Sequence, residues 1–187
     1  MTKKLDELNK KTVLPHTALS NFQIEKSLPG SKVVQYQHIH DFKTINQLFK
    51  KSKLIVLLYN SSETYGHWTL LMRKRGEISF FDSYGYEIDE HSSNFVPRDL
   101  NLREHNINNT NYLAKILYDF KKKHPKIKIT WNEHQFQRKD QTVETCGYWV
   151  VDRGINMNLS VKEYYKRFAN IQNKDNAVIL LTKGLIK

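Results

Sequence analysis

The pattern of apolar and polar positions divides the middle of the chain into short strands. Residues 54–59 (LIVLLY) are six consecutive apolar positions, a pattern typical of a central strand that is buried on both faces. Four further segments have strand-like patterns: 33–36, 67–72, 77–81 and 126–131. The basic segment 73–76 separates two of them and predicts a tight turn, so the sequence indicates at least one β-hairpin.

Helical patterns lie on either side of these strands. Residues 111–120 (NYLAKILYDF) form an amphipathic pattern that ends in a run of lysines, which suits a helix C-terminus. Residues 147–157 suit a buried helix despite their β-branched content. Shorter helices are predicted at 17–27, 43–50, 161–168 and 177–181. The fold class expected is therefore α+β, with a small, mostly antiparallel central sheet flanked by helices.

The length and composition favour one globular domain. The chain has 187 residues, of which 39% are hydrophobic and 12% aromatic, enough for a single buried core. We expect one domain over 1–187, with residues 1–15 as a flexible or helical N-terminal extension. The polar N-terminus has no signal-peptide pattern, and no apolar run has transmembrane length. We therefore expect a soluble protein that acts inside a cell or particle.

The charge balance of the chain indicates which class of molecule it could bind. Thirty Lys and Arg residues against 19 Asp and Glu residues give a net charge of +11. The basic residues form clusters at 50–53, 73–75, 121–128 and 138–139. Any one cluster is more often a solvated surface, but together they indicate a polyanionic partner, nucleic acid first. Zinc-finger spacing, an RRM signature and a phosphate-binding glycine loop are absent from the sequence.

Cys146 is the only cysteine in the chain, and it lies in the segment ETCGYWVV (144–151). A lone thiol beside Gly147 at the start of an apolar run has the local form of a nucleophile. Glycine leaves room beside the backbone, and a helix N-terminus favours the thiolate. The alternative is a small buried hydrophobic residue, which is the more common role of a single cysteine. The local sequence alone favours that alternative.

His67 and Asp82 could complete a cysteine hydrolase. His67 begins a predicted strand after a polar loop, and the indole of Trp68 is expected to cover its imidazole and exclude water. Asp82 ends the next strand, so the predicted hairpin brings residues 67 and 82 to the same end. An aspartate there can hold the imidazole tautomer and stabilise the imidazolium. The alternatives are a satisfied surface or core histidine and an aspartate that begins the turn 82–85.

Two hydrogen-bond donors are needed for the oxyanion that such a reaction forms. The backbone N–H of Cys146 at a helix start is one candidate. An upstream side-chain amide is the other, with Gln135, Gln137 and Gln141 available, although glutamines in polar loops are usually solvated. The chain order histidine, aspartate, cysteine differs from that of papain-like enzymes, and the sequence around Cys146 differs from that of caspases.

Three motifs in this order resemble those of the adenain-type cysteine proteases: GHW (66–68), FDSYG (81–85) and TCGY (145–148). This family includes the adenovirus maturation protease and its relatives in Maverick/Polinton elements, virophages and large DNA viruses, with SUMO-specific proteases as more distant members. The resemblance covers most of residues 17–183. Three further segments fit the Maverick and virophage branch: 55–59, 111–120 and 159–165.

The resemblance implies a role for each candidate residue. Cys146 would be the nucleophile, His67 the general base and acid, and Asp82 the third member, where adenovirus enzymes carry glutamate and SUMO-protease relatives aspartate. The family's oxyanion glutamine ends the strand before the cysteine, which favours Gln137. The loop from Gln137 to Cys146 is then longer than usual, whereas the alternative, Gln141, would make it shorter than usual.

The resemblance also implies a function and partners. We expect a viral maturation endopeptidase that cleaves capsid or virion precursor proteins, at small or glycine-containing sites, in the virion and at the cytoplasmic site of virus assembly. The enzyme is expected to be monomeric and to require no cofactor or metal, with DNA as a stimulating polyanion. Alternatives are a deubiquitinase or deSUMOylase that acts on Gly-Gly isopeptide bonds and a non-catalytic nucleic-acid-binding virion protein.

The single cysteine limits how a peptide could activate such an enzyme. The adenovirus-type relatives are stimulated by a short capsid-derived peptide that attaches through a disulfide. That attachment would consume Cys146, because no second cysteine exists. We therefore expect either a non-covalent activating peptide or none.

Overall fold

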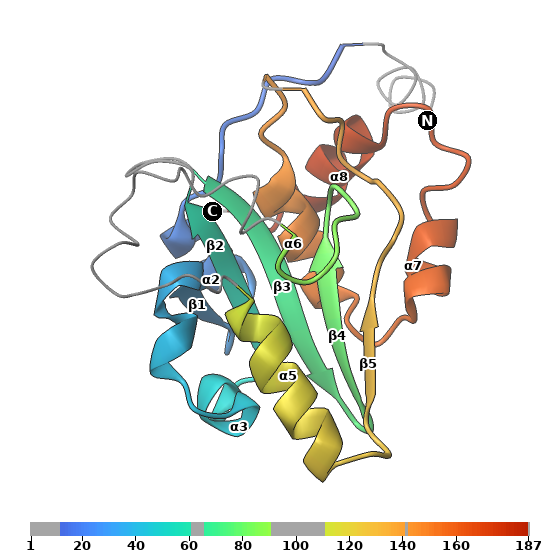
Figure 1. The fold of residues 1–187 in the computed structure, drawn as a ribbon. Coiled ribbons are helices and arrows are strands. Elements are labelled where there is room, and N and C mark those ends of the chain that lie inside the picture. Colours follow the sequence, from blue (N-terminus) through green and yellow to red (C-terminus); the bar gives the residue numbers. More distant parts are fainter. Residues whose placement is uncertain (1–11, 61–65, 91–110, 141, 187) are drawn as a thin grey trace.

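A mixed sheet forms the centre of the fold in the computed structural model, which describes residues 12–60, 66–90, 111–140 and 142–186. Within these residues the sheet has five strands in the order β1-β2-β3-β4-β5 (Figure 1). The strands are β1 (Lys32–Gln35), β2 (Leu54–Asn60), β3 (Gly66–Lys74), β4 (Glu77–Asp82) and β5 (Lys128–Trp131). All five lie where the sequence predicts strands, within two residues at most ends.

The predicted hairpin forms the middle of the sheet. Strands β2, β3 and β4 are antiparallel neighbours, while the edge strands β1 and β5 pair in parallel with β2 and β4. The α+β class is confirmed, and the sheet is mixed rather than mostly antiparallel. The reason is that each edge strand is connected to its neighbour by a helical crossover, which returns the chain in the same direction.

Helices cover both faces of the sheet (Figure 1). They are α2 (Asn21–Ser27), α3 (Ile45–Phe49), α5 (Tyr112–Lys123), α6 (Cys146–Ile155), α7 (Val161–Lys166) and α8 (Lys174–Thr182), with the 3-10 helix η1 (Tyr36–Asp41). The helix predicted from residue 17, α2, begins at Asn21, because the Ser20 side chain accepts the Gln23 N–H and caps it. The sequence did not predict η1. No described helix combines the length and apolar character that a membrane span requires.

Two apolar cores lie on opposite faces of the sheet, as strand alternation requires. Val56, Leu70 and Phe81 face α6 and α8, whereas Ile55 and Leu71 face α3 and α5. Helix α6 is buried along most of its length between the sheet and the C-terminal helices. This burial fixes the N-terminus of α6, where Cys146 lies, at one end of the sheet.

Candidate active site

His67 and Asp82 meet at the end of the hairpin where β3 begins and β4 ends. Asp82 pairs with Thr69. His67 lies two residues before Thr69, nearer the start of β3, so its side chain is on the same face of the sheet as that of Asp82. The His67 Nε2 atom lies 3.3 Å from the Asp82 Oδ1 atom. Both side chains are buried, at 3% and 0% exposure. The structure thus brings together the two residues that the sequence places at the same end of a hairpin.

Asp82 also organises the turn that follows β4. Its Oδ1 atom accepts the Tyr84 N–H at 2.6 Å, and its backbone carbonyl accepts the Gly85 N–H at 3.0 Å. The Asn132 side chain holds the Asp82 backbone from both sides, accepting its N–H and donating to its carbonyl. Asp82 is therefore both the predicted turn residue and the partner of His67.

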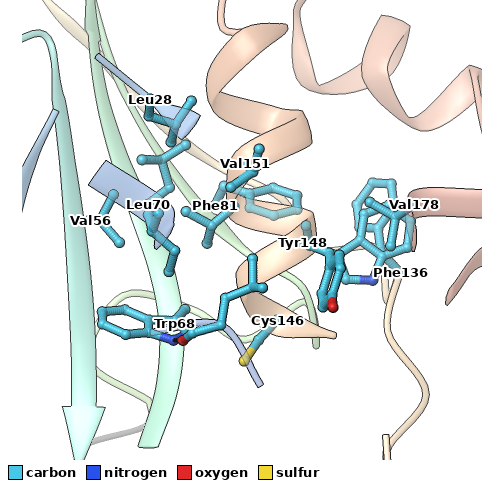
Figure 2. Packing of buried hydrophobic residues seen from close by; sticks show 14 of the residues in the cluster. Leu28, Val56, Trp68, Leu70, Phe81, Phe136, Cys146, Tyr148, Val151 and Val178 are labelled. Carbon is cyan, nitrogen blue, oxygen red and sulfur yellow. Dashed lines mark hydrogen bonds between the residues drawn. The ribbon is translucent and has the colours of Figure 1, made fainter. Parts of the chain in front are cut away.

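Cys146 is the first residue of α6 and is 7% exposed. Figure 2 shows it at the edge of the apolar cluster, between Trp68 and Tyr148. Its backbone N–H belongs to the first turn of the helix, whose donors have no partner within the helix. The predicted helix start is confirmed, and it gives the thiol the positive end of the helix dipole.

The pKa of His67 is raised from its ordinary value of 6.5 to about 10. Burial, the largest single influence, lowers this pKa because it disfavours the charged imidazole. The charge and hydrogen bond of Asp82, together with the hydrogen bond and charge of Cys146, outweigh burial. These interactions favour the imidazolium form of His67. A cation beside the sulfur stabilises the thiolate, which is the nucleophilic form of cysteine.

Gln137 lies beside these residues and is held by several hydrogen bonds. Its Nε2 atom donates to the Val143 carbonyl at 2.6 Å and to the Tyr84 hydroxyl at 3.2 Å. Its Oε1 atom accepts the Ser83 hydroxyl at 2.8 Å. The buried amide is thereby fixed between the turn after β4 and the segment that leads to Cys146.

The other two glutamines differ from Gln137 in position. Gln135 donates to the Gln137 carbonyl and does not line the cleft that contains Cys146. Gln141, the alternative oxyanion residue, lies outside the described residues.

Tyr84, not Trp68, covers the imidazole. The Tyr84 and His67 rings stack with centroids 4.6 Å apart and planes at 17°. The expectation for Trp68 is wrong because neighbouring residues of a strand point to opposite faces. Its indole packs in the core beside α6 and donates to the Leu19 carbonyl at 2.9 Å. The DSYG turn could have indicated Tyr84, but the sequence held no signal for the support that Asn132 gives to Asp82.

A cleft of about 1340 Å³ opens onto this group of side chains. His67, Tyr84, Gln137 and Cys146 line it, and it extends along β1 to Phe42. This volume exceeds that of most small-molecule pockets, so the cleft has room for a segment of polypeptide. Among the described residues, no three or more His, Cys, Asp or Glu side chains are grouped so that they could hold a metal ion.

Comparisons with known proteins concern the sequence and the overall fold of the chain. No family model matches the chain. It is 33% identical to the uncharacterized protein V9 of Sputnik virophage over 151 residues, which are 80% of this chain and 82% of that protein. Among solved structures it resembles ChlaDub1 from Chlamydia trachomatis, with a TM-score of 0.52, 11% identity and coverage of 93% of this chain and 94% of that one.

A second similar structure is the ASFV pS273R protease, with a TM-score of 0.49, 16% identity and coverage of 93% and 72%. At these identities the likeness concerns the fold alone, and the sheet with its flanking helices is shared with ChlaDub1. The identity to V9 is high enough and long enough to indicate common descent. The chain therefore belongs to the same family as protein V9 of Sputnik virophage.

Proposed function

We propose that the protein is a cysteine endopeptidase with Cys146 as nucleophile, His67 as general acid and base, and Asp82 as the group that orients His67. The observation that carries this proposal is the buried imidazole, which interacts with both Asp82 and Cys146 at the mouth of a peptide-sized cleft. A structural histidine would not need a cysteine at a helix N-terminus beside it.

The proposed reaction follows from this arrangement. The Cys146 sulfur attacks the carbonyl carbon of the scissile bond, and the His67 imidazolium gives its proton to the leaving nitrogen. The Cys146 N–H donates a hydrogen bond to the carbonyl oxygen as it becomes negative. Gln137 donates a second one when this oxygen replaces the Tyr84 hydroxyl as the acceptor of one of its two amide N–H groups. Water then attacks the thioester with His67 as base, which releases the acid product and restores the sulfur.

The proposed substrates are capsid or virion precursor proteins, cut at small or glycine-containing sites during assembly in the host cytoplasm and in the virion. The viral relative supports this choice of setting. A second candidate is hydrolysis of Gly-Gly bonds at the C-terminus of ubiquitin-like proteins, which the fold shared with ChlaDub1 favours. The third is a non-catalytic virion protein that binds nucleic acid through its basic surface.

One experiment separates these candidates. Wild-type protein and Cys146→Ala are incubated with the capsid proteins encoded in the same genome and, separately, with ubiquitin-like fusion proteins. Cleavage of capsid protein by the wild type alone supports the maturation role, and cleavage of the fusions alone supports the second candidate. If the wild type cleaves neither, the binding-protein alternative takes the place of the proposal.

The basic surface supports a proposed role for DNA as a stimulating partner. Lys122, Lys123, Lys126 and Lys128 are exposed. The end of α5 and the start of β5 lie near the β3–β4 turn, at the end of the sheet opposite the start of α6 (Figure 1). Duplex DNA at low salt should therefore retard the protein on a gel and raise its turnover, both effects fading as salt increases. DNA that does neither would contradict this role. Any activating peptide would bind without a disulfide and should act equally well in the presence of a reductant.

A further inference from the structure

A buried carboxylate on α8 connects the two segments that carry Cys146 and Gln137. Asp175 lies in the first turn of α8 and is 2% exposed. Its Oδ1 atom accepts the Thr145 hydroxyl at 2.5 Å and the Trp149 indole N–H at 3.2 Å. Its Oδ2 atom accepts the Arg138 backbone N–H at 3.1 Å.

The three donors to Asp175 lie beside the proposed catalytic residues or on the helix that carries Cys146. Thr145 directly precedes Cys146, and Arg138 directly follows Gln137. Trp149 lies one turn further along α6, on the helix that carries Cys146 at its start. One carboxylate thus joins the backbone beside the proposed nucleophile to the backbone beside the proposed oxyanion donor, across eight residues of loop.

The chemistry of the contacts requires a carboxylate. Three donors converge on Asp175, and its two oxygens together offer acceptor sites to all of them. An asparagine in its place has one oxygen and one NH₂ group. The NH₂ group must then face either the Arg138 N–H or the Trp149 N–H, and a buried donor without an acceptor is costly.

We propose that Asp175 is a positioning residue that fixes the Cys146 end of α6 against the Gln137 segment. The inference rests on the proposed function, because it concerns where the substrate carbonyl oxygen is held. Asp175 does not touch His67, so the loss of its contacts should leave the His67–Cys146 pair intact while Gln137 shifts. A displacement of about 1 Å at such a site can cost about 100-fold in rate.

The test compares Asp175→Asn with Asp152→Asn. Asp152 is a buried carboxylate on the other end of α6, where it accepts the Tyr164 hydroxyl at 2.7 Å and an Arg167 guanidinium N–H at 2.9 Å. It does not line the cleft, so it controls for the loss of a buried carboxylate. Thr145→Val removes one donor to Asp175, and Thr145→Ser keeps the hydroxyl.

Two readouts separate positioning from stability. The first is kcat and KM on a fluorogenic peptide with Gly-Gly before the leaving group. The second is the rate at which iodoacetamide alkylates Cys146, which the single cysteine makes specific. Alkylation depends on the thiolate and uses no oxyanion donor. We expect Asp175→Asn and Thr145→Val to lower kcat about 10- to 100-fold and to change alkylation by less than about threefold, with Thr145→Ser and Asp152→Asn near wild type.

The outcomes distinguish a failure of the Asp175 positioning role from a failure of the proposed protease function. If Asp175→Asn changes kcat no more than Asp152→Asn does, or if cleavage and alkylation fall together, the positioning role is overturned while the protease proposal stands. If the wild type neither cleaves the peptide nor reacts rapidly with iodoacetamide, and cleaves no protein substrate, the proposed function itself is wrong and the positioning role falls with it.

Discussion

The imidazole of His67 and the carboxylate of Asp82 lie 3.3 Å apart, although the sheet pairs Asp82 with Thr69 rather than with His67. The offset of two residues puts both side chains on one face at the open end of the hairpin. Asn132 and the Tyr84 N–H hold Asp82 in place from outside the hairpin. The carboxylate is therefore pre-positioned for the imidazole.

Asp82→Asn should reduce catalysis much more than stability. The amide can still accept the Tyr84 N–H, but it no longer stabilises the imidazolium by charge. We expect kcat to fall by about 100- to 10,000-fold, the range for lost support of a general acid–base group. Steady-state cleavage of the Gly-Gly peptide measures the effect, and circular dichroism checks the fold. A loss below tenfold in a folded variant would contradict the role given to Asp82.

The raised pKa of His67 predicts a pH-dependent stability. The folded state holds this proton up to about pH 10, whereas the unfolded chain releases it near 6.5. Between these values the folded state binds more protons, so the free energy of unfolding should fall as pH rises, by up to about 1.4 kcal/mol per pH unit. Below pH 6.5 this contribution is fully present, and above pH 10 it is lost.

Urea unfolding of wild type and His67→Gln between pH 6 and 10 measures this contribution. Groups that do not interact with His67 act alike in both proteins and cancel in the difference. The same comparison in a Cys146→Ala background removes the coupled thiol. We expect that difference to shrink steadily as the pH increases. Two curves that stay parallel over the whole window would mean that the folded protein does not hold the His67 proton.

The local sequence pattern predicted the central strands, helix α5 and helix α6 well, because each has a clear hydrophobic periodicity or a long apolar run. The parallel edge pairings were not predicted, since their partners are decided by contacts over long stretches of chain. The short helix η1 was missed for a related reason. Its burial comes from packing against β2 and α5, which no local pattern reveals.

In the candidate site, too, residues with a local sequence signal could be predicted, and those that depend on long-range contacts could not. His67, Asp82 and Cys146 could be chosen because each begins or ends a predicted element beside a recognisable motif. Asp175 could not be chosen, because it follows Cys146 by 29 residues and reads as an ordinary acidic residue in a first helical turn. Its three donors come together only in the folded structure.

Gln137→Leu should lower kcat while the Cys146 thiolate is retained. Leucine has a similar volume but cannot donate to a developing oxyanion, and loss of one such donor costs about 100- to 1,000-fold in kcat. The Ser83 hydroxyl and Val143 carbonyl also lose a partner, so some loss of stability is expected. Gln137→Glu is the matched variant, because it keeps the shape and places a negative charge beside the oxyanion.

Cleavage kinetics and iodoacetamide alkylation together test whether Gln137 acts as an oxyanion donor. We expect both variants to be nearly inactive in cleavage. Gln137→Leu should alkylate within about threefold of wild type, because alkylation needs no oxyanion donor. A Gln137→Leu protein that cleaves at the wild-type rate would show that another group supplies the second donor.

Two glycines on α6 provide a contrast that tests how tightly the nucleophile is packed. A Cβ atom at Gly147 would lie 2.8 Å from the Leu19 Cβ, whose backbone is held because its carbonyl accepts the Trp68 indole N–H. A Cβ at Gly154 would lie 2.8 and 2.9 Å from the Leu28 methyl groups, which can rotate away. Gly147→Ala must therefore move backbone next to Cys146.

We expect Gly147→Ala to lower the free energy of unfolding by about 1–3 kcal/mol, as overpacking does, and to reduce kcat. Gly154→Ala should change stability by less than about 1 kcal/mol, because the gain in helix propensity offsets the contact. Urea unfolding and cleavage of the Gly-Gly peptide measure both effects. Equal losses in the two variants, or a Gly147→Ala protein as stable and active as wild type, would show that Leu19 yields and does not fix the start of α6.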